Sequence, residues 1–319
     1  MIAVVGCGYW GSKLVRVFSS AGVLSHIVEP DIEVAESLSY EYAIPNSEFN
    51  TILANPEVKG VVISTPSPSH ANLAIEALEA GKHIFVEKPL AMDLQDAEAV
   101  ATLAREKGLT LMVGHLLQYH PVFQEMKRII YEDGIGDLKY IYSNRLSFGR
   151  IRTEENVMWS FAPHDLSMIL SLLGSEPEVV SAHGASFITP GIIDWSVINL
   201  RHEKGVFSHI HTSWLHPYKE HRFVVIGDNG MMVFDDTQEE WNRKLLHYQH
   251  SVRVVNGLPE LDKAIPEYLA VDYTEPLKNE CDHFIQCVLS DDSPHTDGDE
   301  AVSVIRILCE AEVKLNKCY

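Results

Sequence analysis

Two side chains that could exchange protons stand out, one in each half of the chain. Lys88 follows an apolar run in the stretch Ile84-Phe85-Val86-Glu87-Lys88-Pro89, and His164 follows Pro163. Histidine suits proton transfer near neutral pH because its ordinary pKa is about 6.5. A lysine that keeps its charge stabilises a developing alkoxide. Together with a cofactor that accepts hydride, such a pair could oxidise a secondary alcohol.

A glycine-rich loop near the amino terminus predicts where that cofactor binds. A short apolar strand at residues 2–5 leads into Gly6-Cys7-Gly8-Tyr9-Trp10-Gly11, and helical periodicity follows. Gly6 permits a tight turn, Gly8 lets the backbone approach a pyrophosphate, and Gly11 lets the helix pack closely on the strand. The helix N-terminus adds unpaired N–H groups and a partial positive charge. The loop therefore predicts a dinucleotide site.

Glu29 predicts which dinucleotide is preferred. It ends the next expected strand, 18 residues after Gly11. A carboxylate at about this spacing accepts hydrogen bonds from the adenosine ribose and repels a 2′-phosphate. Because neither arginine nor lysine occurs between Glu29 and Lys59, NAD is favoured over NADP. The alternative is that Glu29 is only a polar residue at the end of a strand.

Strands and helices alternate through the first third of the chain. Strands are expected at residues 2–5, 26–28, 60–64, 83–86 and 110–113, and further helices at 34–42, 71–80 and 94–107. This alternation predicts a parallel sheet with helices on both faces, in which ligands bind at the carboxyl ends of the strands. Residues 1–117 are therefore expected to form an NAD-binding domain of the Rossmann type, and the overall fold class is α/β.

The stretch Glu87-Lys88-Pro89 falls at the same carboxyl edge as the glycine loop. Pro89 keeps Lys88 out of the helical region and stiffens the turn, which suits a side chain that must be aimed. The alternative is a surface turn with a local ion pair.

The remaining residues, 118–319, are expected to form a second, α+β domain. Long strands are expected at residues 138–148, 178–187, 195–201, 206–214 and 222–227, and helices at 121–131, 164–173, 279–289 and 299–314. Short connections such as 227–230 imply antiparallel neighbours. We expect a large, mostly antiparallel open sheet with helices on one face. Its other face predicts a subunit contact, in a homodimer or homotetramer.

Bulk composition narrows the class of protein. The chain has 319 residues, enough for two domains, and its net charge of -20 argues against binding to nucleic acid. Five cysteines without regular spacing predict a reducing, cytoplasmic location. No apolar stretch approaches the roughly 18–20 residues needed to cross a bilayer, and the first residues lack the basic segment of a signal peptide.

The order of these motifs resembles that of a known family, the Gfo/Idh/MocA oxidoreductases, named for glucose-fructose oxidoreductase and inositol dehydrogenase. The resemblance covers the whole chain and rests on Gly6-x-Gly8-x-x-Gly11, Glu29, Ser64-Thr65-Pro66 with His70, Glu87-Lys88-Pro89 and His164-Asp165. It implies that Lys88 contacts the substrate hydroxyl near the nicotinamide, often next to a cis Lys-Pro bond, and that Glu87 contacts the nicotinamide ribose. The other cofactor-binding residues that it implies are Gly6, Gly8, Tyr9, Trp10, Gly11, Glu29, Ser64, Thr65, Pro66 and His70.

One position departs from the family pattern. Many members carry Asp-x-x-x-His, with the histidine as proton acceptor; His164 matches, but Ser160 stands where the aspartate is expected. His164 remains the candidate base. Asp165 could supply the carboxylate, although adjacent residues of a helix point in different directions. The alternative for His164 is a residue at the start of a helix, bonded to backbone.

Three arginines predict that the substrate carries a phosphate group. Arg145, Arg150 and Arg152 lie close together in an acidic chain, and arginine is suited to bidentate contacts with phosphate. The alternative is a set of solvated arginines paired with Glu154 and Glu155.

The surrounding stretches, with Tyr119, Ser160 and His164, resemble the nucleotide-sugar branch of the family, which includes UDP-N-acetylglucosamine 3-dehydrogenases. The implied substrate is a nucleotide sugar oxidised to a keto sugar. An inositol or free-sugar dehydrogenase remains an alternative, as does a regulatory protein that binds the dinucleotide without catalysis.

Two further groups are not expected to do chemistry. His209 and His211 lie two residues apart on an expected strand, near His216 and His221, but neither a cysteine nor an acid completes a metal-ligand set. We therefore expect no metal. Cys7 is expected to be a small spacer in the glycine loop.

Overall fold

The chain folds into two compact units. The computed structural model describes residues 1–149, 151–153, 155–290 and 292–315. Unit 1 comprises Met1–Tyr119 and Glu275–Arg306, and unit 2 comprises His120–Thr274 and the residues from Ile307 onward. The first boundary thus lies two residues after the one predicted at 117, but the predicted division into 1–117 and 118–319 does not include the return of residues 275–306 to unit 1.

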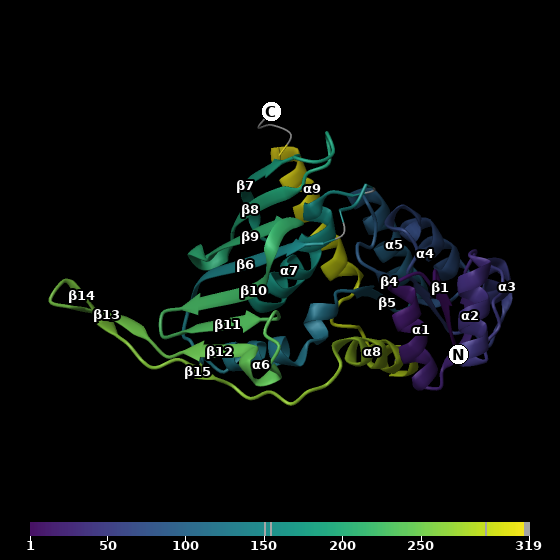
Figure 1. The fold of residues 1–319 in the computed structure, drawn as a ribbon, viewed down its shortest axis with the longest axis horizontal. Coiled ribbons are helices and arrows are strands. Elements are labelled where there is room, and N and C mark those ends of the chain that lie inside the picture. The colour runs from purple at the N-terminus through teal and green to yellow at the C-terminus, as the bar shows by residue number, and fades with distance from the viewer. Residues whose placement is uncertain (150, 154, 291, 316–319) are drawn as a thin grey trace. The chain divides into compact units, whose positions relative to one another are not determined.

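Unit 1 contains the parallel sheet that the sequence predicts (Figure 1). Its strands are β1 (Ile2–Val5), β2 (Leu24–Val28), β3 (Gly60–Ile63), β4 (His83–Glu87) and β5 (Leu111–Gly114). Within the described residues they pair in the order β2-β1-β3-β4-β5, and each pair is parallel. β1, β3 and β5 are buried throughout, as is typical of a parallel sheet covered on both faces.

Helices follow these strands. They are α1 (Gly11–Ser20), α2 (Ile32–Tyr42), α3 (Phe49–Ala54), α4 (His70–Glu79), α5 (Leu94–Lys107), α8 (Pro276–Ser290) and α9 (Gly298–Leu315), which ends in unit 2. α8 joins unit 1 because its apolar side packs there: the ring of Phe284 meets Phe18 and Phe85 edge-on, at centroid distances of 6.3 and 5.8 Å. Such aromatic contacts add to the burial of apolar area.

Unit 2 contains a large open sheet. Its strands are β6 (Leu138–Phe148), β7 (Glu178–Ala185), β8 (Trp195–Arg201), β9 (Phe207–Ser213), β10 (Leu215–Gly227), β11 (Met231–Asp235), β12 (Leu245–Tyr248) and β15 (Glu267–Tyr268). In the described part of the chain the order is β15-β12-β11-β10-β6-β9-β8-β7. β6 and β9 are parallel and the other neighbours are antiparallel. The prediction of a mostly antiparallel sheet is confirmed.

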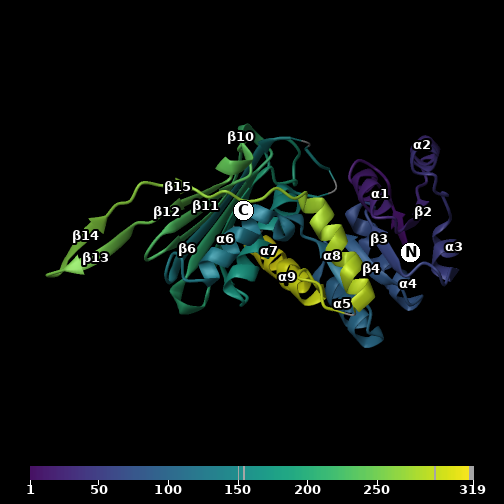
Figure 2. The same cartoon turned by 90° about the horizontal axis from the view of Figure 1, so that it is seen from below.

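Helices α6 (Pro121–Tyr131) and α7 (Val157–Leu173) cover one face of this sheet (Figure 2). Burial alternates along the strands as expected for a sheet with one covered face: in β8, Ile198 is fully buried and its neighbours Val197 and Asn199 are partly exposed. The open face carries stacked rings, including Tyr142 against His209 at 5.5 Å.

α7 begins seven residues before the predicted helix at 164–173. Asn156 caps its N-terminus, since its side chain accepts hydrogen bonds from the N–H groups of Met158 and Trp159 at 3.0 and 3.1 Å. Pro163 lies inside the helix. His164 is therefore an interior helix residue, and the prediction that it starts a helix is wrong.

No helix in the described part of the chain is both long and apolar enough to span a membrane.

Candidate active site

Close packing explains the glycines of the loop between β1 and α1. Gly6 has φ of +82°, and a Cβ there would lie 2.8 Å from the backbone nitrogen of Thr65. A Cβ on Gly11 would lie 2.0 Å from the carbonyl oxygen of Gly6. A Cβ on Gly8, in contrast, would meet nothing within 4 Å among the described residues. Gly6 and Gly11 are thus needed by the fold, whereas Gly8 leaves the loop open to a ligand.

The N-terminus of α1 is suited to hold that ligand's phosphates. Within the described residues it has neither a side-chain cap nor an acidic residue in its first turn, so its N–H groups favour an anion. The nearby thiol of Cys7 takes no part in this, because burial and the charge of Glu29 raise the pKa of Cys7 to about 12. The loop and the helix therefore fit a dinucleotide.

Glu29 follows β2 and its carboxylate reaches back to the glycine loop. Its Oε2 atom accepts a hydrogen bond from the N–H of Cys7 at 2.6 Å, and its Oε1 atom accepts one from the N–H of Asp31 at 2.9 Å. The side chain of Asn46 fixes the backbone of Glu29 with two further bonds of 3.0 Å. This places the carboxylate beside the loop, where an adenosine ribose would be recognised.

His70 connects the turns that follow β3 and β4. It is 1% exposed, and its ring nitrogens lie 2.7 Å from the carbonyl oxygen of Pro89 and 2.8 Å from that of Thr65. The ring therefore holds the turn after Lys88 against the turn after β3. This geometry gives His70 a positioning role beside the predicted cofactor contact, which stays a prediction.

Glu87 ends β4 and joins the Lys88 turn to the glycine loop. The indole N–H of Trp10 donates a hydrogen bond to its Oε1 atom, and the N–H of Lys88 donates one to Oε2 at 3.3 Å. A Cβ on Gly114 would lie 2.8 Å from Oε2, so glycine leaves room for the carboxyl group. The Lys88–Pro89 bond is cis, as the resemblance implied. The lysine is thus placed at the cofactor edge of the sheet.

The carboxyl group of Glu280, in α8, interacts with that of Glu87. Glu280 is fully buried, and within the described residues neither of its oxygens has a hydrogen-bond partner. Burial and the charge of Glu87 raise the pKa of Glu280 well above its ordinary value. Burial also raises the pKa of Glu87 to about 7, although the Trp10 bond and the Lys88 charge act in the opposite direction. A buried acid with no partner is best accommodated in its neutral form.

The raised pKa of Glu87 predicts a pH dependence of stability. The folded state binds more protons than the unfolded state between the unfolded pKa of about 4.3 and the folded pKa of about 7. The free energy of unfolding should therefore fall as pH rises through this window. Glu87→Gln, which cannot ionise, should flatten the dependence. Urea unfolding of both proteins at several pH values measures it, and parallel curves would contradict the assignment.

In unit 2, a buried ion pair lies beside His164. The guanidinium of Arg145 donates to both oxygens of Asp165, at 2.7 and 2.8 Å, and the hydroxyl of Ser143 donates to Asp165 at 2.6 Å. Asp165 is fully buried and Arg145 is 9% exposed. Burial lowers the pKa of Arg145, but the Asp165 carboxylate more than offsets this. Both groups are thus engaged within unit 2. The substrate contact of Arg145 stays a prediction, as does the use of Asp165 as the auxiliary carboxylate.

Other predicted site residues differ in their surroundings. Ser160 is buried in α7, one turn before the half-buried His164. Arg152 forms an ion pair with Glu155 at 3.0 Å, which is one of the pairings considered as an alternative to phosphate binding. Tyr119 is buried, and its hydroxyl lies 3.1 Å from both Thr296 Oγ1 and His283 Nδ1. Arg150 and Glu154 lie outside the described residues.

The histidines of the open sheet face have other partners. The hydroxyl of Tyr140 is bonded to His209, and the indole of Trp195 donates to His211 at 2.7 Å. Among the described residues, no three or more side chains of the metal-binding types come together.

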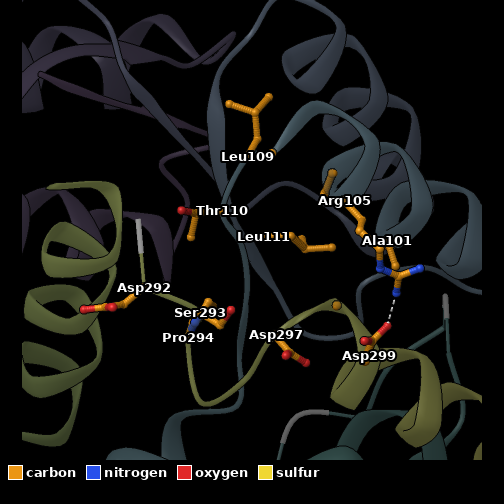
Figure 3. A pocket seen from close by; sticks show the side chains of 13 residues that line it. Ala101, Arg105, Leu109, Thr110, Leu111, Asp292, Ser293, Pro294, Asp297 and Asp299 are labelled. Carbon is orange, nitrogen blue, oxygen red and sulfur yellow. Dashed lines mark hydrogen bonds and ion pairs between the residues drawn. The ribbon is translucent and has the colours of Figure 1, made fainter. Parts of the chain in front are cut away.

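A pocket of about 320 Å³ lies beside the amino end of β5 (Figure 3). It is lined by the end of α5, by residues 108–111 at the amino end of β5, and by residues 292–294 and 297–299. An ion pair between Arg105 and Asp299 lies at its rim. Since the glycine loop and Lys88 lie at the carboxyl ends of the strands, this pocket is not the cofactor site.

Glu280 was missed by the sequence reasoning. The sequence pattern predicts that a glutamate in an amphipathic helix faces solvent. Its burial was indicated only by its position among the apolar residues Leu277, Cys281 and Phe284. Trp10 was implied only by resemblance; its bond to Glu87 joins residues 77 apart in the sequence.

The chain matches models of known domains in both halves. Residues 1–115 match the oxidoreductase family with an NAD-binding Rossmann fold, and residues 123–233 match the GFO/IDH/MocA C-terminal domain. The oxidoreductase YrbE of Bacillus subtilis, which is uncharacterised, is 31% identical over 252 residues, covering 74% of this chain and 73% of that protein.

Relatives of named activity are also found. UDP-N-acetylglucosamine 3-dehydrogenase of Acidithiobacillus ferrooxidans is 33% identical over 191 residues, covering 58% of each chain. The solved structure of that species' enzyme GnnA has a TM-score of 0.86 at 23% identity and covers 99% of this chain and 97% of its own, which shows the fold. The NAD(+)-dependent scyllo-inositol 2-dehydrogenase of Bacillus subtilis is 27% identical, covering 95% of this chain and 90% of that protein. The glycine loop, the Glu-Lys-Pro turn and these matches together show that this chain is an oxidoreductase of the Gfo/Idh/MocA family.

Proposed function

We propose that the protein oxidises a secondary hydroxyl of a nucleotide sugar to the ketone, with NAD as the hydride acceptor and UDP-N-acetylglucosamine, at its 3-position, as the first substrate to test. The observation that carries the proposal is the placement of Lys88 at the carboxyl end of β4, joined through Glu87 to Trp10 of the glycine loop. The relative that acts on UDP-N-acetylglucosamine supports the choice of substrate.

Lys88 and His164 have different roles toward the substrate hydroxyl. Lys88 donates a hydrogen bond to its oxygen and stabilises the negative charge that develops there. His164 accepts the proton as the C–H bond breaks. Bound NAD would supply the acceptor for the hydride that leaves the carbon bearing the hydroxyl. The step balances in charge: the alcohol loses one proton and one hydride, and a neutral ketone remains.

The cofactor preference should depend on Glu29. We expect NADH to bind more tightly than NADPH, because the carboxylate that bonds Cys7 would repel a 2′-phosphate. Glu29→Gln should narrow the gap by about 1.5–3 kcal/mol, the scale of hydrogen bonds to a charged group. Dissociation constants from fluorescence titration measure this. NADPH binding as tight as NADH binding in the native protein would refute the assignment.

The arginines should distinguish a nucleotide sugar from a free sugar. If Arg150 and Arg152 hold the diphosphate, Arg152→Ala should raise the KM for the nucleotide sugar by about tenfold or more, the effect of one lost charge-assisted bond. The KM for a free sugar should change little. Glu155→Gln is the matched control, since it removes the observed partner of Arg152 but not the cation. Equal loss on both substrates would indicate damage to the loop.

A substrate panel tests the proposal itself. UDP-sugars, free sugars and inositols are incubated with protein and NAD, and the absorbance of reduced nicotinamide is followed. Rapid reduction with a UDP-sugar supports the proposal. Reduction with an inositol alone would favour the second candidate, which the likeness to scyllo-inositol 2-dehydrogenase supports over most of the chain. Binding of NAD without turnover of any substrate would favour a regulatory protein.

We further propose that the open face of the eight-stranded sheet is a subunit contact, in a homodimer or homotetramer. The partly exposed rings of Tyr140, Tyr142 and Trp195 on this face support a contact, because soluble proteins rarely leave large apolar surfaces in water.

A further inference from the structure

Residues 251–265 form a hairpin and its continuation, which we call the arm. Strands β13 (Ser251–Val255) and β14 (Leu258–Asp262) pair with each other in a sheet of their own. The turn between them, Asn256-Gly257, has φ of 53° and 81°. Two left-handed residues of these types form the turn that best fits a hairpin's twist. The sequence thus encodes a defined ribbon, and Figure 1 shows it extending beyond β12.

One face of the ribbon is entirely apolar. Residues that pair directly across an antiparallel ladder share a face, and alternate residues along a strand share it too. The pairs Val252–Leu261 and Val254–Pro259 therefore lie together on one face. The opposite face carries the charged pair Arg253–Glu260 and the polar pair Ser251–Asp262, with the apolar pair Val255–Leu258 beside the turn. Only the first face is apolar along its whole length, which predicts that it is the face another surface covers.

Unit 2 does not cover that face. Val254 is 74% exposed, Leu261 67% and Val252 54%, and every described residue from 252 to 262 is exposed. Six of the 22 exposed large apolar side chains in the described residues lie in the 15 residues of the arm, and three of these, Val252, Val254 and Leu261, lie on the apolar face. A two-stranded hairpin alone in water is marginally stable at best. The ribbon therefore requires another surface to pack against.

The charge of the arm indicates what supplies that surface. The chain as a whole has a net charge of -20, so two copies repel each other. The arm carries two cationic and two anionic side chains, Arg253, Lys263, Glu260 and Asp262, and so has no net charge. A neutral, apolar surface in a strongly acidic chain is where copies can meet without repulsion, and contacts between like subunits are typically the more apolar ones.

The size of the arm indicates a symmetric pair. A stable dimer buries about 1,200–2,000 Å² of surface in total. The four apolar side chains of a single arm cannot bury this much area. In a two-fold pair the same contact forms twice, because each copy gives an arm and receives one. We propose that the apolar face of the arm, Val252, Val254, Pro259 and Leu261, packs against a second copy of this chain in a reciprocal exchange. This inference goes beyond the proposed function and holds for any substrate.

Sedimentation over a concentration series tests the proposal on the full chain. The native protein should be at least dimeric. Val252→Lys with Val254→Lys places two charges in the contact and should raise the subunit dissociation constant by about tenfold or more. A second variant replaces residues 251–262 with a short glycine-serine linker and should act in the same direction. Thermal unfolding followed by circular dichroism checks that unit 2 stays folded in each variant.

The matched control uses the other face of the same strands. Arg253→Ser with Glu260→Ser removes the charged cross-strand pair opposite the apolar face, and with it the exposed ion pair of Arg253 with Asp262. It should leave the dissociation constant within about twofold, because exposed ion pairs contribute little. A native protein that is monomeric at every concentration would overturn the proposal. So would a linker variant that keeps the native assembly, since the open sheet face alone would then hold the subunits together.

Discussion

Lys88→Ala is expected to lower turnover by about 10²–10⁴ while NADH still binds, the usual effect of removing a positioned group that acts on the transition state. The reason lies in the placement of Lys88 at the cofactor edge, beside the Glu87 carboxyl group that Trp10 holds. Steady-state kinetics on the best substrate measures turnover, and fluorescence titration measures NADH binding. Lys88→Met separates charge from volume, because it keeps the apolar stem.

Lys107→Ala is the control for this experiment. Lys107 is an exposed lysine in the last turn of α5, in the same unit, and its loss should leave turnover unchanged. His164→Asn should match the effect of Lys88→Ala if both groups act on one hydroxyl. Turnover within a few-fold of native in either variant would show that the residue is not part of the acid–base machinery. Loss of NADH binding in Lys88→Ala would instead point to a damaged turn.

Asp165→Ala is expected to destabilise unit 2 by about 3–5 kcal/mol, the cost of leaving one member of a buried ion pair without its partner. Asp165 is fully buried and accepts three hydrogen bonds, two from Arg145 and one from Ser143. Its removal leaves a largely buried guanidinium, on a residue that is 9% exposed, without its partner. Urea unfolding, followed by circular dichroism, measures the change in the free energy of unfolding.

A double variant and an exposed pair provide the controls. Arg145→Met with Asp165→Leu removes both charges, and it should cost much less than the two single changes together, because no buried charge is left alone. Arg201→Ala breaks the pair with Glu178, in which both side chains are more than half exposed, and should cost about 1 kcal/mol or less. A cost for Asp165→Ala no larger than this would show that the buried pair does not hold unit 2 together.

The buried pair of Arg145 and Asp165 also concerns position 160, where this chain has Ser160 in place of the family's aspartate. Asp165 was considered as a substitute for the family's aspartate, but its oxygens accept bonds from Arg145 and Ser143. Activity of the folded double variant tests the pair as a unit. Turnover near the native value would leave Arg145 and Asp165 structural residues, and a loss of turnover without a loss of stability would give one or both of them a role in the reaction.

Local sequence determined the architecture of residues 1–119 and the turns at the carboxyl edge of their sheet. The glycine loop, the buried runs at β1, β3 and β4, and the Glu87-Lys88-Pro89 turn depend on neighbouring residues only, and periodicity and steric limits on the backbone are local properties. The strands of unit 2 with long alternating patterns, such as β6 and β8, could be predicted for the same reason, with the bounds that the structure shows.

Only the tertiary structure decided which polar groups meet. The bond from Trp10 to Glu87, the interaction of Glu280 with the same carboxyl group and the ion pair of Arg145 with Asp165 join residues distant in sequence. Burial, which exists only in the folded chain, is the largest cause of the raised pKa of Glu87 and of Glu280. The return of α8 to unit 1 depends on the packing of Phe284 against Phe18 and Phe85. Sequence patterns carry the propensity of each segment, but contact energies between distant segments arise only when the chain is folded, so no local pattern contains them.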